Sequence, residues 1–416
     1  MSTYTESGQA AAQKVQKNSF SRNSGRYPLN VLIKPVSGGC NMNCTYCFYC
    51  DEMENRSQKS FGIMTEQTAE HLIQKALDGT HSACTFAFQG GEPTLRGLDF
   101  FRFFCDAVRS YNTHKIPVQF ALQTNGIVID KEWAAFFAEE GFLIGLSMDG
   151  NKRIHDSLRK IHAGGKGTHK SLNGQQGGSA VEGTFNKVLH TARLFDNHRV
   201  EYNILTVVSA PLAKNIKEVY EFYLRNNFMY QQYIPCLDPI GEKSPAHEWS
   251  LTPEVYGDFL KTLFDLWYRS FKREKPVSIR YFDNLVLMLL GRPPESCGML
   301  GRCTFQHVIE ADGSVFPCDF YVLDSYKLGN IHTAGFEDIA KAREKIGFIE
   351  KSLHTDEECK TCNWYPLCRG GCRRDRDTFT DKPLEKNRFC ASYKAFFPYA
   401  YERLAEIARI IGSRRF

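Results

Sequence analysis

Cysteine placement constrains this chain more than any other feature, because eleven of its fifteen cysteines fall into three groups. The most diagnostic group is Cys40-Asn41-Met42-Asn43-Cys44-Thr45-Tyr46-Cys47, a C-x3-C-x2-C run that directly follows an apolar, strand-like segment. Three closely spaced cysteines supply three of the four thiolates that a [4Fe–4S] cluster normally takes. One iron is then left open for a small molecule, which separates a cluster that does chemistry from one that only stores an electron.

A zinc knuckle is the alternative interpretation of this cysteine run. Zinc prefers four protein ligands in a closed structural site, and no histidine follows the run at zinc spacing. Cys50 is the one further cysteine near the run, and as a fourth ligand it would close the cluster. Its spacing is tight, so we interpret it as a spare thiol and expect Cys40, Cys44 and Cys47 to be the ligands.

The composition is that of an ordinary globular protein. The chain has 416 residues, 42% hydrophobic and 24% charged, which suits two or three domains. Its net charge of +5 is small and its basic residues are mostly scattered, so we expect no nucleic-acid partner. The start of the chain lacks a signal sequence, and no apolar run approaches the roughly 18–20 residues needed to cross a bilayer. We therefore expect a soluble, cytoplasmic protein without a membrane partner, whose cysteines ligate metal rather than form disulfides.

The hydrophobic pattern alternates short apolar runs with amphipathic stretches after a polar segment, residues 1–27, that we interpret as a flexible tail. Strands are expected at residues 30–34, 84–88, 118–122, 143–147, 201–207 and 230–234. Helices are expected at residues 65–77, 98–111, 131–140, 184–196 and 213–225. Strand–helix alternation predicts an α/β fold with a parallel sheet, and six units are too few for a closed eight-stranded barrel. The pattern therefore predicts a partial (β/α)6 barrel over 28–235, with its reactive loops at the carboxyl ends of the strands.

The remaining segments differ in composition. Residues 161–182 are rich in Gly, Ser, Gln and Lys, which is typical of a flexible surface insertion; a lid is the alternative. Residues 236–296 are interpreted as a linker and helical segment, with a helix that begins at Pro253 after the N-cap residue Thr252. Cysteine density rises from Cys297 onward, so a small second domain is expected over 297–416. A hairpin with an Asp312-Gly313 turn is expected near its start.

The cysteine run together with Gln89-Gly90-Gly91-Glu92-Pro93 resembles the radical S-adenosylmethionine (SAM) superfamily. The resemblance implies that the open iron holds the amine and carboxylate of S-adenosylmethionine, and that cluster reduction releases a 5′-deoxyadenosyl radical. It implies that Gly90, Gly91 and Glu92 contact the methionine amine. Ser147 would contact the ribose, Arg159 the carboxylate, and Tyr46 would pack near the cofactor. The same rim would also include Gln89, Asn125 and Asp149.

Eight C-terminal cysteines suit two four-thiolate clusters, with two zinc sites as the alternative. The segment Cys359-x2-Cys362-x5-Cys368-x3-Cys372 followed by Cys390 resembles the SPASM extension of radical peptide-maturing enzymes. The resemblance implies a nearer cluster on Cys297, Cys303, Cys318 and Cys372. It implies a farther cluster on Cys359, Cys362, Cys368 and Cys390, making three [4Fe–4S] clusters in all. Cys84, Cys105 and Cys236 lie in apolar surroundings and are interpreted as packed thiols.

Longer segments, among them Phe88–Thr94 and Pro317-Cys318-Asp319-Phe320-Tyr321, resemble anaerobic sulfatase-maturating enzymes from about Pro28 to near the C-terminus. This implies oxidation of a Cys or Ser in a C/S-x-P-x-R-type segment of an unfolded or nascent sulfatase to Cα-formylglycine. Asp319 would be the base, although it could instead cap a turn or pair with an arginine. The auxiliary clusters would accept the released electron, or only fold the domain. Ferredoxin or flavodoxin would be the reducing electron donor. The lower-ranked candidates for substrate binding are Tyr49, Asp238, Arg280 and Asp283.

Two alternative functions share many of these features. A related SPASM peptide maturase that forms thioether or carbon–carbon crosslinks would keep every cluster ligand. A non-catalytic multi-cluster electron carrier would need neither the Gly-Gly-Glu-Pro turn nor Ser147, because it binds no S-adenosylmethionine. The sequence leaves the preference for Cys or Ser open.

Overall fold

A curved, mostly parallel sheet forms the centre of the computed structural model, which describes residues 28–162, 181–380 and 382–413. The strand order in this 10-stranded sheet is β12-β11-β10-β1-β2-β3-β4-β7-β8-β9. The six predicted strands lie side by side in chain order: β1 (Leu29–Ile33), β2 (Cys84–Phe88), β3 (Val118–Thr124), β4 (Leu143–Ser147), β7 (Glu201–Val208) and β8 (Tyr230–Pro235). They pair in parallel throughout, and β12 and β9 stand at opposite edges of the sheet. The predicted partial (β/α)6 barrel is confirmed.

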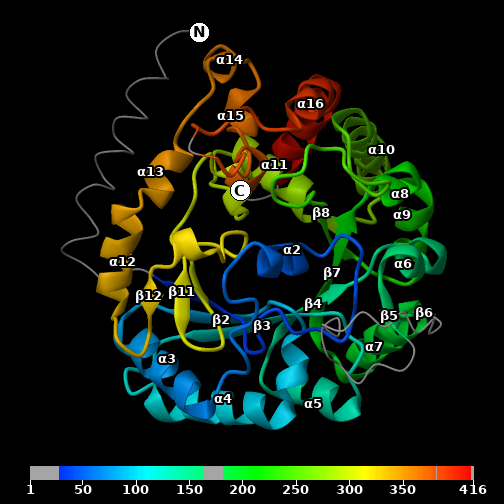
Figure 1. Ribbon diagram of the computed structural model, residues 1–416. Coiled ribbons are helices and arrows are strands. Elements are labelled where there is room, and N and C mark those ends of the chain that lie inside the picture. The colour runs from blue at the N-terminus through cyan, green and yellow to red at the C-terminus, as the bar shows by residue number, and fades with distance from the viewer. Residues whose placement is uncertain (1–27, 163–180, 381, 414–416) are drawn as a thin grey trace.

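Helices cover the outer side of the sheet, with α3, α4, α5 and α7 along the lower edge of the view in Figure 1. The helices of this half are α2 (Phe48–Glu54), α3 (Glu66–Asp78), α4 (Leu98–Tyr111), α5 (Lys131–Glu139), α6 (Lys152–Leu158), α7 (Phe185–His198), α8 (Ala210–Lys214) and α9 (Ile216–Arg225). The single helix predicted at 213–225 is wrong at its start. Asn215 leaves the helical conformation at φ −115° and separates α8 from α9.

Local sequence signals explain why these elements form where they do. Thr65 caps α3 by accepting from the Thr68 N–H, and Asp130 caps α5 in the same way. Strand β2 buries Phe86 and Phe88, and the Phe88 ring meets that of Phe104 in α4 with centroids 5.0 Å apart. Such edge-to-face aromatic contacts add to the apolar area removed from water. Aromatic packing therefore helps to hold α4 against the sheet.

The second half of the chain extends both edges of the same sheet. Its elements are α10 (Pro253–Lys272), β9 (Ser278–Ile279), α11 (Arg280–Leu289), β10 (His307–Ile309), β11 (Ser314–Phe316), β12 (Gly329–Asn330), α12 (Phe336–Lys345), α13 (Phe348–Ser352), α14 (Glu357–Lys360), α15 (Tyr365–Cys368) and α16 (Cys390–Ser413). Strand β9 pairs in parallel with β8, and β10 pairs in parallel with β1. The β10–β11 hairpin turns at Gly313, whose φ is +82°, as the Asp-Gly pair predicts. The division of the chain at 235 and 296 stays a prediction, because the sheet runs past both positions.

Two of the predicted segments lie largely outside the residues that the structure describes. The tail 1–27 and residues 163–180 of the predicted insertion lie outside the described residues. The ends of the insertion form β5 (Lys160–His162) and β6 (Val181–Gly183), which pair antiparallel as a separate ribbon. Among the described residues, no helix has the length and apolar character needed to cross a membrane.

A buried ionic network connects the residues that follow β1, α2 and β10. Lys34 Nζ lies 3.1 Å from Glu310 and 3.7 Å from Glu52, and Arg56 Nη1 also lies 3.1 Å from Glu310. All four side chains are buried. Burial is the largest single effect on the pKa of Glu310 and raises it, but the charges of Lys34 and Arg56 oppose burial and the pKa is lowered overall. Glu310 is therefore the shared counter-charge of the network.

Replacing Glu310 by glutamine is expected to destabilise the protein by about 3–5 kcal/mol, because the buried Arg56 then loses its ion pair and Lys34 keeps only its longer one, to Glu52 at 3.7 Å. The free energy of unfolding can be measured by urea titration of the cluster-free protein. Glu54→Gln is the matched control, since its pair with Lys59 is exposed and worth about 0–1 kcal/mol. Equal stability of the two variants would contradict the prediction.

Candidate functional site

The Cys40–Cys47 loop lies at the carboxyl end of β1 and leads into α2. Two backbone hydrogen bonds hold the loop: Asn43 N–H donates to Lys160 O at 2.9 Å and Thr45 N–H to Leu158 O at 3.0 Å. Burial raises the pKa of Cys40, and the charges of Glu92, Cys44 and Cys47 raise it further. The three thiols thus lie within electrostatic reach of one another. The exposed Cys50 hydrogen-bonds to Cys47 and lowers the pKa of Cys47 to about 6.

The Gly-Gly-Glu-Pro turn packs directly against this loop. Gly90 and Gly91 have φ of +83° and +52°, and a Cβ on Gly91 would lie 2.1 Å from Gly39 O. Only glycine allows so close an approach. The Glu92 N–H also donates to Gly39 O at 2.7 Å. The two loops therefore form one wall at the carboxyl ends of β1 and β2.

Glu92 ties this wall to the end of β3. Its buried carboxylate accepts from the Asn125 N–H at 2.6 Å and from Thr124 Oγ1 at 2.8 Å, as well as from Thr94. Burial raises the pKa of Glu92, and the Asn125 N–H opposes that rise. Both carboxylate oxygens thus have partners within the chain, so the side chain positions the turn.

The loops after β3 and β4 complete the rim. Asn125 Nδ2 donates to Asn41 Oδ1 at 2.8 Å and lies 3.7 Å from Cys40 Sγ. Gln123 Nε2 donates to Ser147 Oγ at 2.9 Å. Asn125 therefore lies beside the cysteine loop, and Ser147 lies at the neighbouring strand end.

Tyr46, Asp149 and Arg159 form a buried chain of contacts beside Cys44. The Tyr46 hydroxyl donates to Asp149 Oδ2 and accepts from Arg159 Nη1 at 2.8 Å. Arg159 Nη1 also lies 3.8 Å from Asp149 Oδ2. Arg159 Nε is buried without a hydrogen-bond partner among the described residues. An arginine with an unused, buried N–H suits an anionic group such as a carboxylate.

Asp319 follows Cys318 in the chain and contacts Gln89, the residue before the Gly-Gly-Glu-Pro turn. Its Oδ2 accepts from the Tyr49 hydroxyl at 2.7 Å and from Gln89 Nε2 at 3.2 Å. Its Oδ1 is buried and has no hydrogen-bond partner among the described residues. Burial raises the pKa of Asp319, and the Lys34 ammonium opposes that rise. Among the described residues this carboxylate neither caps a turn nor pairs with an arginine, so one oxygen is anchored and the other is left as an acceptor.

The eight C-terminal cysteines separate into two sets. Burial raises the pKa of Cys318, and the thiols of Cys372, Cys303 and Cys297 raise it further. Burial likewise raises the pKa of Cys368 to about 11, with Cys390, Cys359 and Cys362 adding to the rise. The members of each set therefore lie within electrostatic reach of one another, and Cys372 belongs with the first set although it follows Cys368 by four residues.

The alternative interpretation of these cysteines is two zinc sites, each of which would hold a single metal ion. In the part of the chain that the structure describes, no three His, Cys, Asp or Glu side chains are grouped so that they could hold one metal ion.

Comparison with known proteins adds to this geometry. The Radical SAM superfamily model matches residues 35–174, and the model of the SPASM iron-sulfur cluster-binding domain matches residues 297–363. A cysteine-type anaerobic sulfatase-maturating enzyme of Clostridium novyi is 45% identical over 387 residues, covering 93% of this chain and 99% of that protein. The chain belongs to the anaerobic sulfatase-maturating enzyme family.

Further comparisons agree with that assignment. A solved structure titled as native anSMEcpe with bound AdoMet and Cp18Cys peptide is 45% identical with a TM-score of 0.84, covering 92% of this chain and 100% of that one. A serine-type anaerobic sulfatase-maturating enzyme of Bacteroides thetaiotaomicron is 28% identical, covering 89% of each chain.

As a member of the family, the protein is a radical SAM enzyme with S-adenosylmethionine and [4Fe–4S] clusters as cofactors. The carrier alternative is set aside, because family membership makes the protein an enzyme. The three thiol groups and the orphan Nε of Arg159 fit these cofactors. All fifteen cysteines are free of disulfides, as expected.

The four lower-ranked substrate residues have different partners in this family member. Tyr49 lies against Asp319. Asp238 is buried and paired with Arg388 at 3.1 Å, and Arg280 donates to Gln232 at 3.3 Å. Asp283 accepts from Ser278 and lines a mostly apolar pocket of about 260 Å³ between α10, α11 and α16. Of the four, only Tyr49 contacts the candidate base.

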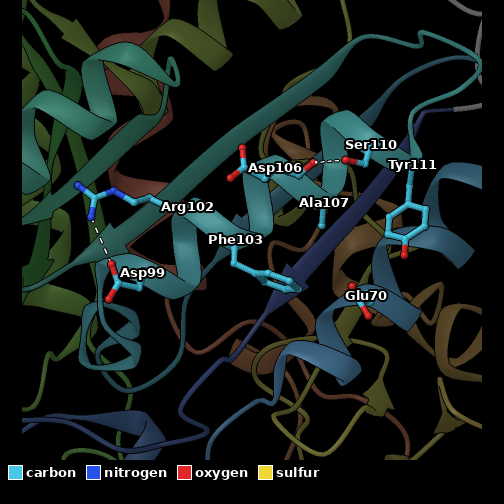
Figure 2. Close-up of a pocket in the computed structure, with 8 residues that line it drawn as sticks. All are labelled: Glu70, Asp99, Arg102, Phe103, Asp106, Ala107, Ser110 and Tyr111. Carbon is cyan, nitrogen blue, oxygen red and sulfur yellow. Dashed lines mark hydrogen bonds and ion pairs between the residues drawn. The ribbon is translucent and has the colours of Figure 1, made fainter.

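A second pocket of about 500 Å³ lies on the outer helical layer of the enzyme, between α3 and α4. Figure 2 shows Arg102 turned toward Asp99, with a contact of 3.2 Å, and Ser110 bonded to the backbone of Asp106. None of the predicted site residues lines this pocket. It is therefore separate from the candidate active site.

Sequence reasoning missed Lys34 as a neighbour of the base. Lys34 Nζ lies 4.7 Å from the Tyr49 ring centroid and acts on Asp319. Its position after β1, next to Pro35, carried no charge pattern that would reveal this contact.

Proposed function

We propose that this enzyme oxidises a cysteine in a C/S-x-P-x-R-type segment of an unfolded or nascent sulfatase to Cα-formylglycine. The observation that carries the proposal is the buried Asp319 carboxylate, with Oδ2 anchored by Tyr49 and Gln89 and Oδ1 open. The 45% identity with cysteine-type sulfatase-maturating enzymes supports the same reaction. It acts in the cytoplasm, where thiols stay reduced.

The first cluster is held by Cys40, Cys44 and Cys47. The Met42 N–H, 3.4 Å from Cys40 Sγ, and Asn125 Nδ2 supply polar contacts to this thiolate. When bound, the cluster and S-adenosylmethionine supply the 5′-deoxyadenosyl radical that removes hydrogen from the substrate Cβ. Arg159, whose Nε is unused, would bind the methionine carboxylate, and Ser147 would bind the ribose. The other contacts to S-adenosylmethionine come from Tyr46, Gln89, Gly90, Gly91, Glu92, Asn125 and Asp149.

Asp319 accepts the proton of the substrate thiol at Oδ1. A carboxylate is ionised at neutral pH when its pKa is ordinary, and Lys34 offsets part of the effect of burial here. Tyr49 and Gln89 fix the orientation of the carboxylate, which keeps the open oxygen directed to one position. The base is thus held by residues from α2 and the end of β2.

Removal of one hydrogen atom from Cβ, the thiol proton and one electron would leave a thioaldehyde, and water would then supply the aldehyde oxygen as hydrogen sulfide leaves. Bound auxiliary clusters would supply the acceptor for that electron. The nearer cluster is held by Cys297, Cys303, Cys318 and Cys372, and the farther one by Cys359, Cys362, Cys368 and Cys390. Cys318 directly precedes the base, so the electron acceptor and the proton acceptor are neighbours in the chain. A ferredoxin or flavodoxin reduces the first cluster.

Cysteine is the preferred substrate residue, because the 45% identical relatives are cysteine-type and the serine-type relative is 28% identical. A thiol, with an ordinary pKa of about 8.5, also loses its proton to a carboxylate more readily than a hydroxyl does. We expect a Cys-x-P-x-R peptide to be oxidised about tenfold faster than its serine counterpart, a barrier difference of about 1.4 kcal/mol.

The test is anaerobic: reconstituted and reduced enzyme is mixed with S-adenosylmethionine and either peptide, and the products are read by mass spectrometry. Aldehyde at the cysteine, together with 5′-deoxyadenosine, supports the proposal. Deoxyadenosine without peptide oxidation would refute it and favour a crosslinking peptide maturase instead. Faster oxidation of the serine peptide would refute the substrate preference alone.

A further inference from the structure

The chain passes from one C-terminal thiol set to the other within a single tight turn. Cys368 belongs to the farther set and Cys372 to the nearer, with Gly370 and Gly371 between them at φ of +81° and +72°. A Cβ on Gly371 would lie 2.4 Å from Asn387 Nδ2, which donates to Gly370 O at 3.1 Å. The turn is therefore closely packed and brings the two thiol sets to either side of it.

The guanidinium of Arg376 lies over this turn. A Cβ on Gly370 would meet Arg376 Nη1 at 3.5 Å, and the residue is only 6% exposed. Arg376 donates to three backbone carbonyls: Glu385 O at 3.4 Å, Ser352 O at 3.3 Å, and His354 O. No carboxylate of the described chain forms an ion pair with Arg376.

The neighbouring arginines of this region are neutralised differently. Arg373 Nε lies 3.2 Å from Asp377, and Arg388 pairs with Asp238 and Asp375. A buried charge without a counter-charge is strongly unfavourable. Arg376 is therefore a buried cation whose counter-charge must come from something other than a carboxylate.

Arg376 reaches a member of each thiol set. The Cys303 N–H donates to Ser352 Oγ at 2.9 Å, and the carbonyl of the same Ser352 accepts from Arg376. Gly370, over which the Arg376 guanidinium lies, is two residues from Cys368 of the farther set and two residues from Cys372 of the nearer set. One guanidinium thus lies between the nearer and the farther set.

We propose that Arg376 is the shared counter-charge of the two auxiliary clusters. Its positive charge raises the reduction potential of both. The inference rests on the cluster assignment in the proposed function. Reducing a four-thiolate cluster adds one negative charge, and a fixed cation in a low-dielectric surrounding favours that form. Arg376 thereby makes both clusters better acceptors for the electron released by the substrate.

The test compares reduction potentials in the fully reconstituted enzyme and in its Arg376→Gln variant, by anaerobic redox titration followed by electron paramagnetic resonance. Glutamine keeps hydrogen-bond donors but removes the charge. We expect the equilibrium constant for one-electron reduction to fall about tenfold for both auxiliary clusters, which is about 59 mV. The Cys40–Cys47 cluster should keep its potential.

Arg374→Gln is the matched control, because the half-buried Arg374 donates to Asp238 O at 3.2 Å and lies over the Phe379 ring. Its potentials should equal those of the parent. Unchanged potentials in Arg376→Gln, or a change in only one auxiliary cluster, would overturn the inference.

If the glutamine variant loses its auxiliary clusters, the Arg376→Lys variant, which keeps the positive charge, shows whether the charge itself is what matters. Retention of both clusters at parental potentials in the lysine variant supports the inference, and their loss overturns it. Iron analysis of the parent protein distinguishes failure of this inference from failure of the proposed function. A parent without two auxiliary clusters would refute the cluster assignment itself, and this inference with it.

Discussion

Replacing Asp319 by asparagine is expected to lower formylglycine production by about 10²–10⁴-fold while S-adenosylmethionine is still cleaved. Asparagine has nearly the same shape and still accepts from Tyr49, so the geometry at Oδ2 is preserved. It cannot accept the thiol proton as a carboxylate does. The measurement is parallel quantification of peptide aldehyde by mass spectrometry and of 5′-deoxyadenosine by chromatography.

Measuring both products distinguishes the loss of the base from misfolding of the protein. A misfolded protein would lose both products, whereas a missing base uncouples deoxyadenosine from aldehyde. Asp324→Asn is the matched control, because this exposed carboxylate in the following segment only accepts from the Ser57 N–H. Aldehyde formation by Asp319→Asn at the parental rate would exclude Asp319 as the base.

Replacing Cys44 by alanine is expected to abolish S-adenosylmethionine cleavage altogether. The three-cysteine loop leaves no spare ligand, since a cluster with an open iron needs all three thiolates. Cys44 also lies beside Arg159, whose charge lowers the pKa of Cys44 against the larger effect of burial. Iron and sulfide analysis should show one cluster fewer than in the parent, and deoxyadenosine should fall to background.

Cys50→Ala is the control for that loss, because Cys50 lies three residues after Cys47, in the first turn of α2, yet is exposed. This variant should keep the cluster and cleave S-adenosylmethionine close to the parental rate. It loses only the hydrogen bond between Cys50 and Cys47. If cleavage were lost here and kept in Cys44→Ala, the assignment of ligands in the loop would be wrong.

Much of the fold could be predicted because its signals are local. The six apolar runs became neighbouring parallel strands, and Thr65 and the Asp312-Gly313 pair mark a helix start and a turn where the pattern places them. The helix expected at 213–225 failed at Asn215, where the side chain donates to Pro211 O and the backbone leaves the helix. Hydrophobic periodicity does not register such a break, because Leu212 and Ile216 both remain buried on either side of it.

The sequence by itself determined the chemistry available to this protein, since cysteine spacing within the Cys40–Cys47 loop already limits which cofactor it can hold. Tertiary structure alone decided which residues meet. Gln89 and Tyr49 converge on Asp319, over 200 residues away along the chain, and Arg376 lies between two thiol sets. Asp283, expected near the substrate, faces a pocket among α10, α11 and α16. The reason is that local patterns encode only neighbours along the chain, whereas sheet register and loop packing bring distant side chains together.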